Sequence, residues 1–315
     1  MSKKILYLFI MILPLICSCE KQIELELPSA DPKLVVDGWF TNEPAEDGGE
    51  RLQTIRLTKS LPYFATQSFP VVKDALVILK DSKGNSFPLN FEVPEKMDSN
   101  LGKMVKDEKN GRYEIRKNLE KDISYTLYIK TKDGKEYESS PQKVISYPYT
   151  PKITVEYHEA DDMEWDDDGY YINYEPKFLE EGNYYFTWQL YKVDTYTDYS
   201  DYDNPREASY NYPLSDMRWG SNVYTSVEES QTYFDQAGQI GEKYFIKQNV
   251  LAKEVYDYLR LAEEQRDNEG TQFSPPPAPL RGNIKRIGSN NLDDHALGFF
   301  IISSVQQTQT ITISE

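Results

Sequence analysis

Residues 124–139 read Ser-Tyr-Thr-Leu-Tyr-Ile-Lys-Thr-Lys-Asp-Gly-Lys-Glu-Tyr-Glu-Ser, and this stretch decides the fold class of the chain. Apolar side chains alternate with polar ones from Tyr125 to Ile129, which is the pattern of a strand with one buried face. Asp133 and Gly134 then stand between this run and the next, and such a pair favours a tight hairpin because both residues tolerate positive φ. The stretch therefore predicts two antiparallel strands joined by a short turn.

Similar short, β-branched and aromatic runs continue on both sides of this hairpin. A second turn is expected at 81–85, since Gly84 and Asn85 also tolerate positive φ. Strands separated by turns at about 8–12 residues indicate an antiparallel sandwich of the immunoglobulin-like type. The expected strands lie at 33–40, 52–57, 75–79, 111–115, 124–130, 152–157, 170–174, 184–191, 298–305 and 308–313.

These patterns predict a mainly all-β chain in two parts. An N-terminal antiparallel Ig-like sandwich is expected over residues 33–147, followed by a second β-rich domain over 148–315. Two prolines within 147–151 favour an extended connector at this boundary. The second domain should contain one substantial helix at 248–266, because apolar residues recur there at three- and four-residue spacing. Residues 194–212 are polar and predict a long loop.

The N-terminal residues 1–18 predict a lipoprotein signal peptide. Two lysines precede an apolar run that is shorter than the roughly 20 residues a membrane span needs, as in a secretory signal. Ile16-Cys17-Ser18-Cys19 then matches the lipobox cleaved by the bacterial lipoprotein peptidase. We expect Cys19 to become the acylated N-terminus, carrying palmitate-type chains, with 19–32 as a tether. Two or more acyl chains give stable membrane anchoring.

The charge of the chain restricts its partners. The formal net charge is −17, and no clustered basic face is visible in the sequence. Nucleic-acid binding depends on such a face to displace counterions, so nucleic-acid partners are not expected. An anionic lipid surface would also repel the protein, which leaves membrane attachment to the lipid anchor.

An acidic segment resembles the start of a calcium loop. Oxygen-bearing side chains at Glu164, Asp166 and Asp168 fall on loop positions one, three and five, Gly169 on six and Glu175 on twelve. The first position is Glu where the pattern has Asp, and 170–174 predicts a strand where the pattern has a helix. A calcium site and a solvated acidic loop both remain open, with the solvated loop favoured. No other cofactor is expected.

Tyrosine is unusually frequent, at 25 residues. Tyrosine supplies a rigid contact surface and a hydroxyl at small entropic cost, and stacked rings suit sugars and peptides. The polar stretch 194–212 is therefore equally compatible with a ligand or partner surface and with an ordinary covering loop. The candidate surface residues are Tyr196, Tyr199, Tyr202, Tyr210 and Tyr212.

Catalytic patterns are weak. The chain has two histidines, His158 and His295, without zinc-site spacing. A triad around Asp293, Asp294 and His295 is conceivable, but the Gly-x-Ser-x-Gly nucleophile motif is missing from the sequence. Because the chain has 52 acidic residues, chance pairs of carboxylates are no indication of glycoside hydrolysis. We expect no enzyme and assign no catalytic residue.

Several short segments follow one another along nearly the whole chain: the lipobox with the acidic Ile-Glu-Leu-Glu-Leu-Pro after it, 33–39, 56–60, 62–64, the 133–139 hairpin, 182–188, 276–277, 281–284 and 297–300. In this order they resemble the Bacteroidetes outer-membrane lipoprotein family that carries the domain of unknown function 4249. The resemblance implies an outer-membrane lipoprotein that is accessory to a TonB-dependent uptake receptor, with no catalytic residues to carry over.

We therefore expect a non-enzymatic, lipid-anchored outer-membrane protein that assists a TonB-dependent receptor in nutrient capture, with a glycan or peptide as ligand. Acid close behind the lipid cysteine favours the cell surface over the periplasmic face. Two other classes stay open: a surface glycan or peptide hydrolase, and a structural or adhesive envelope lipoprotein. A receptor gene immediately upstream would favour the first hypothesis, and a hydrolase cluster the second.

Overall fold

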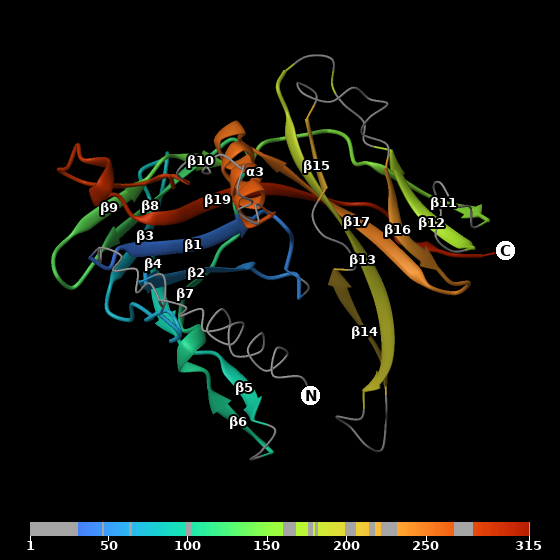
Figure 1. Ribbon diagram of the computed structural model, residues 1–315, viewed down its shortest axis with the longest axis horizontal. Coiled ribbons are helices and arrows are strands. Elements are labelled where there is room, and N and C mark those ends of the chain that lie inside the picture. The colour runs from blue at the N-terminus through green and yellow to red at the C-terminus, as the bar shows by residue number, and fades with distance from the viewer. Residues whose placement is uncertain are drawn as a thin grey trace, which may run out of the picture.

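The protein is built mostly from β-strands, as the sequence predicts, with a large curled sheet and one α-helix among the described residues. Figure 1 shows the strands forming long, curled layers with a single helix lying across them among the described residues. The computed structural model describes residues 31–45, 47–62, 65–98, 102–159, 168–175, 179, 182–198, 206–213, 218–221, 232–267 and 280–314.

The N-terminal lobe contains the expected sandwich. Its two layers belong to one 15-stranded sheet that folds over at β4, which pairs with β7 in one layer and β3 in the other. Its strands are β1 Leu34–Thr41, β2 Leu52–Lys59, β3 Leu76–Asp81, β4 Ser86–Glu92, β7 Arg112–Arg116, β8 Ser124–Lys130, β9 Glu136–Ser139 and β10 Gln142–Lys143. A separate hairpin joins β5 Glu95–Asp98 to β6 Lys103–Lys106.

The core of this lobe follows from the alternation read in the sequence. In β8, Tyr125, Leu127 and Ile129 are fully buried, and the facing layer contributes alternate residues such as Val36 and Ile55. The Asp-Gly hairpin forms between β8 and β9 as predicted. Burying these apolar side chains, at about 25 cal/mol per Å², is the main favourable contribution to the stability of this core.

The second lobe is a smaller pair of packed sheets. A three-stranded sheet of β11 Lys152–His158, β12 Gly169–Glu175 and β16 Thr232–Gly238 covers one face of the large sheet's other end. Trp188 and Tyr174 lie at the centre of this core. The large sheet contributes β13 Tyr185–Asp198, β14 Arg206–Pro213, β15 Arg218–Ser221, β17 Lys243–Leu251 and β20 Ile311–Thr312.

Strand β19 Leu297–Gln307 connects the two lobes. Its first part pairs in parallel with β1, from Val35↔Leu297 onward, and its last part pairs antiparallel with β17. The short strand β18 Ile284–Arg286 also returns to the N-terminal lobe, where it pairs with β9. The sandwich is thus antiparallel except at β1 and β19, and residues after the expected boundary at 147 complete its sheet.

The single helix of the described residues, α3, spans Lys253–Asp267 and packs on the outer face of β19 and β17. The predicted start at residue 248 was wrong by about one turn. Gln248 to Leu251 form the end of β17, and Leu251 is buried beneath the helix rather than part of it. The apolar spacing continued across a strand end, which helical periodicity alone does not separate from a first helical turn.

Candidate functional site

The stretch predicted as a long loop over 194–212 is largely a β-ribbon, so the loop prediction was wrong. Strands β13 and β14 pair antiparallel from Tyr191↔Pro213 to Asp198↔Arg206. Aromatic and β-branched residues in β13 favour extended backbone, and this preference prevailed over the polar composition. Of the candidate tyrosines, Tyr196 lies in β13, and Tyr210 and Tyr212 lie in β14. Tyr199 and Tyr202 lie outside the described residues.

The ribbon extends beyond the rest of its sheet. β13 pairs with β17 only as far as Val193↔Lys243, whereas its pairing with β14 continues to Asp198. Figure 1 shows these two strands running out past the ends of their neighbours. β14 is the terminal strand in the sheet order. This end of the ribbon therefore presents both faces and one strand edge away from the described core.

Strand register places three of the candidate tyrosines together. Tyr196 is the register partner of Ala208, Asp194 of Tyr210, and Lys192 of Tyr212. Directly paired residues share one face of a ribbon, and so do alternate residues along each strand. Positions 196, 210 and 212 thus occupy the same face, a relationship that a loop prediction could not give.

Two of the four candidate calcium ligands, Asp168 and Glu175, are described, and they lie far apart. Asp168 precedes β12 and Glu175 ends it, so about seven extended residues, or roughly 23 Å, separate them. Glu175 instead pairs with Lys152, at 3.6 Å. Glu164 and Asp166 lie outside the described residues, and the described part of the chain holds no cluster of three potential metal ligands. Asp168 and Glu175 therefore do not contribute to one site, and a calcium site in the acidic segment stays a prediction.

The two histidines occupy separate elements. His158 ends β11, where its Nε2 lies 3.7 Å from Glu156 and its ring contacts Tyr171. His295 follows the short 3₁₀ helix at Leu292–Asp294. The neighbouring Asp294 accepts a 2.6 Å hydrogen bond from Ser289 Oγ. Asp294 thus takes part in the local turn, and its bond to Ser289 does not orient it toward His295.

A different surface gathers functional side chains, on the outer face of β1, β2 and β7. Strand alternation turns Val36, Ile55 and Tyr113 into the core. The residues between them therefore point outward. Arg56, Arg112 and Arg116 form what we call the arginine face. Two open pockets lie on it.

The first, which we call the tryptophan pocket, has a volume of about 340 Å³. Arg56 Nη2 donates to the carbonyl of Lys109 at 2.8 Å, while its enclosed Nε finds no hydrogen-bond partner in the described structure. Arg112 Nε donates to Glu114 at 2.6 Å. Asp37 and Arg56 are register partners on the adjacent strands. The lining residues are Asp37, Trp39, Thr54, Arg56, Asn110 and Arg112.

Trp39 is held firmly at the edge of this pocket. Its Nε1 donates a 2.7 Å hydrogen bond to Ser303 Oγ in β19. Helix α3 packs against the same region, with the Tyr258 ring 4.5 Å from that of Phe299. Burial raises the pKa of the Tyr258 hydroxyl, and the charge of Asp37 adds to this shift. The helix therefore borders the pocket on its β1 side.

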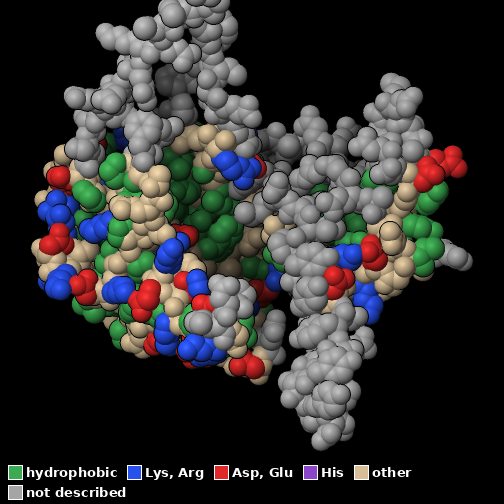
Figure 2. Space-filling view, turned by 60° about the horizontal axis from the view of Figure 1, so that its bottom comes forward, with side chains coloured by type: hydrophobic (Ala, Val, Ile, Leu, Met, Phe, Trp, Pro, Cys, Tyr) green, Lys and Arg blue, Asp and Glu red, His purple; other side chains and the backbone are tan. Residues whose placement is uncertain are grey.

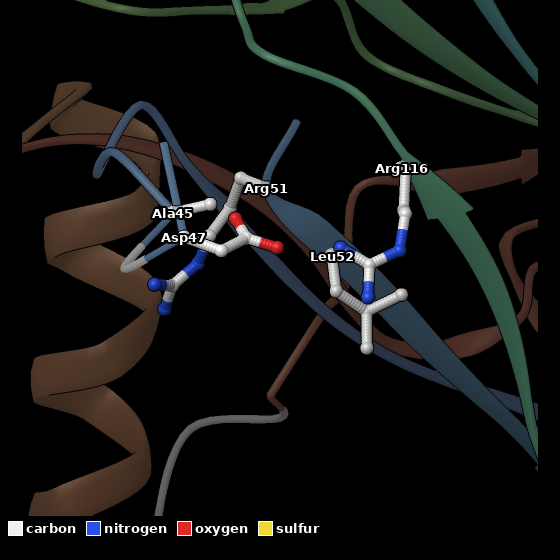
Figure 3. Close-up of a pocket in the computed structure, with 5 residues that line it drawn as sticks. All are labelled: Ala45, Asp47, Arg51, Leu52 and Arg116. Atoms are coloured by element: carbon white, nitrogen blue, oxygen red, sulfur yellow. The ribbon is translucent and has the colours of Figure 1, made fainter. Parts of the chain in front are cut away.

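The second, which we call the leucine pocket, has a volume of about 440 Å³ and lies further along β2 (Figure 3). Arg116 points toward Leu52, whereas Arg51 points away from Arg116. Arg51 pairs with Glu43 at 2.9 Å, and Glu43 also accepts from Lys247 at 2.6 Å. Arg116 Nη1 donates to the carbonyl of Glu50 at 3.3 Å. Arg51, Arg116 and the carboxylate of Asp47 all line this pocket, and Arg116 is the lining cation without an ion pair to a described carboxylate.

Acidic and basic side chains are interspersed on the face of the molecule seen in Figure 2, so the protein does not present a field of one sign there. The arginine face also holds acidic side chains, since Glu114 pairs with Arg112 and Asp37 is the register partner of Arg56. Arg56 and Arg116, however, bond to main-chain carbonyls. Sequence reasoning missed this surface. Charged and aromatic residues at outward positions of the strands could have indicated it. They form a common surface only once the neighbouring strands are known.

The lipidation candidate Cys19 and the apolar run before it lie outside the described residues. Within those that are described, no helix has the length and apolar character needed to span a bilayer.

Comparison with known families gives one match. The family model described as "Domain of unknown function (DUF4249)" matches residues 20–309, nearly the whole chain. No curated protein matches the chain.

Proposed function

The chain belongs to the family of the domain of unknown function DUF4249, and from this membership, its lipobox and its projecting ribbon we propose that it is a lipid-anchored outer-membrane protein that binds a TonB-dependent receptor and assists nutrient capture. Its role is binding rather than catalysis. Acylation of Cys19 would hold the acidic protein at the membrane, where two or more acyl chains are sufficient for stable attachment.

The observation that carries the receptor proposal is the ribbon. Among the described residues, its outer part pairs within itself from Asp194↔Tyr210 to Asp198↔Arg206, and β14 is a terminal strand of the sheet. A strand edge can extend the sheet of a partner through main-chain hydrogen bonds, and tyrosines on one face provide the contact area that dominates protein interfaces. A protruding ribbon with both features suits a large, fixed partner better than a small solute.

The test is co-purification of the full-length lipoprotein from detergent-solubilised outer membranes, with captured proteins identified by mass spectrometry. The wild-type chain should retain a TonB-dependent receptor. Combined substitution Tyr196→Ser, Tyr210→Ser and Tyr212→Ser should reduce its recovery about tenfold or more, because interface tyrosines commonly contribute 1–2 kcal/mol or more each, as an order of magnitude.

The matched control changes the opposite face of the same ribbon. Thr195 and Ser209 are register partners there, and Thr197 is two residues further along β13. Thr195→Ala, Thr197→Ala and Ser209→Ala together should leave recovery unchanged. Equal loss in both variants would indicate a folding defect of the ribbon, which the melting temperature would report. Recovery of the receptor unaffected by either variant would contradict the ribbon as its binding surface.

A further inference from the structure

Two of the three arginines on the arginine face form no ion pair with a described carboxylate, whereas Arg112 pairs with Glu114 at 2.6 Å. Arg56 and Arg116 donate to the carbonyls of Lys109 and Glu50, and neither forms an ion pair with a described carboxylate. In a chain of net charge −17, such arginines are notable. A guanidinium group presents a planar fork of donors that matches a carboxylate in two parallel hydrogen bonds. Arg56 lines the tryptophan pocket, so an acidic ligand group bound there would supply the carboxylate partner that Arg56 lacks.

The remaining lining of the tryptophan pocket indicates more than an anion. Trp39 supplies an aromatic surface whose position is fixed by Ser303. Thr54 and Asn110 can both donate and accept hydrogen bonds, and Asp37 can only accept. An acceptor carboxylate is useful toward hydroxyl groups and unfavourable toward a phosphate. The pocket volume of about 340 Å³ lies within the range of small-molecule sites.

We propose that the arginine face binds an acidic saccharide, with a carboxylated sugar ring in the tryptophan pocket. The ring stacks on Trp39, its carboxylate accepts from Arg56, and its hydroxyls bond to Asp37, Thr54 and Asn110. This inference rests on the proposed role in nutrient capture and names the ligand class for it.

The second pocket extends the same site along the strand. Leu52 is the register partner of Arg116, and Leu52 and Arg56 are four residues apart in β2, or about 13 Å. The two pockets therefore follow each other along β2, and each is lined by an arginine. An extended acidic oligosaccharide that lies along β2 can place one carboxylate at Arg56 and a later one at Arg116.

Polyphosphates and nucleic acids are poorer occupants. Asp37 lines the tryptophan pocket, and Glu114 lies on the same outward face beside Arg112. A polyphosphate offers these carboxylates only acceptor oxygens, whereas each residue of an acidic saccharide also carries hydroxyl groups that can donate to a carboxylate. The arginines and carboxylates of the lining together favour a ligand that carries both carboxylate and hydroxyl groups.

The test is isothermal titration calorimetry with full-length lipoprotein in detergent and trigalacturonic acid as the probe. Wild type should bind it, and Arg56→Gln should weaken binding about 10- to 100-fold, as expected for loss of a charge-assisted hydrogen bond. Arg112→Gln is a second variant of the same pocket, should Arg56→Gln fail to fold. Arg281→Gln removes the same charge at an exposed position beside β18 and should change nothing.

Three further probes separate the sources of the signal. The fully methyl-esterified trisaccharide should bind at least tenfold more weakly, and equal binding would overturn the carboxylate assignment. Triglutamate and inorganic phosphate should not compete. If triglutamate competes, the saccharide assignment is overturned and an acidic peptide becomes the ligand class of this site. If wild type does not bind trigalacturonic acid, the saccharide inference is overturned. Receptor recovery is measured separately, also with Arg56→Gln, and it alone decides the proposed function.

Discussion

Trp39 Nε1 and Ser303 Oγ are joined by a 2.7 Å hydrogen bond although 264 residues separate them in the chain. Two further hydrogen bonds extend from Ser303 to the neighbouring strands. Ser303 Oγ donates to Asn249 Oδ1 at 3.1 Å, and Asn249 Nδ2 donates to Thr187 Oγ1 at 3.3 Å. These residues lie on β1, β19, β17 and β13. The tryptophan of the candidate ligand pocket is thus positioned by the same strands that support the tyrosine ribbon.

Replacing Ser303 with Ala tests this connection. Ser303 is fully buried, so its loss leaves the Trp39 donor and the Asn249 acceptor without their shared partner. We expect a loss of about 1–3 kcal/mol in the free energy of unfolding, measured by urea denaturation. Ser86→Ala, at an exposed serine that begins β4, is the control and should change stability by less than about 0.5 kcal/mol. Equal stabilities of the two variants would contradict the role of this hydrogen bond.

The local sequence pattern was sufficient to predict most strands of the N-terminal lobe, but not the later strands that complete its sheet. Alternation identified β1, β2, β3, β7 and β8 and both predicted hairpin turns, because each reflects contacts between residues close in sequence. It could not show that β19 returns to pair in parallel with β1, since a long-range pairing leaves no mark on either strand alone. The same limit explains the helix start, where Leu251 is apolar because β19 and α3 pack around it.

The candidate site was predictable only in part. Composition directed attention to the tyrosines near residue 200, whereas the register that groups Tyr196 with Tyr210 and Tyr212 comes from strand pairing. The arginine face was missed because Arg56 and Arg112 are ordinary outward residues until β2 and β7 are known to be neighbours. Lipidation at Cys19 depends on a linear motif, and it stays a prediction.

Gly298 tests the parallel return of β19. Its φ is +81°, and an added Cβ would lie 2.0 Å from the carbonyl oxygen of Val36, its register partner in β1. Gly298→Ala should therefore destabilise the protein by more than about 4 kcal/mol, enough to prevent folding.

Gly134→Ala is the matched control, because Gly134 has a similar φ of +80° and nothing within 4 Å of an added Cβ. It should cost about 1–2 kcal/mol, the price of left-handed backbone alone. Urea denaturation of both variants separates the steric from the conformational cost. Similar losses at the two positions would mean that β19 does not approach β1 so closely.

Cys19→Ala tests the anchor. Since Cys19 is the lipobox cysteine, the variant should incorporate no radiolabelled palmitate and should accumulate unprocessed or leave the membrane fraction. Cys17→Ala is the control, because Cys17 lies before the cleavage point and its loss should leave labelling intact. Continued labelling of the Cys19 variant would contradict the lipobox assignment.

The hairpin that decides the fold should also respond to acid. A hydrogen bond from Thr131, followed by one from Lys135, lowers the pKa of Asp133 from 3.8 to about 2. A carboxyl group whose pKa is lower in the folded state stabilises the protein fully above its unfolded pKa and loses that contribution as pH falls through the folded value. The contribution of Asp133 should thus be complete above about pH 5 and disappear between about pH 4 and 2.

Asp133→Asn measures this contribution. The variant should be less stable than wild type at pH 5, and the two urea midpoints should converge as the pH approaches 2. The difference will be small, because the Asp133 side chain is half exposed and solvent screens its contact with Lys135, at 3.0 Å. A gap between the midpoints that stays constant from pH 5 to pH 2 would show that the variant acts on the turn conformation, and that ionisation of Asp133 does not stabilise the hairpin.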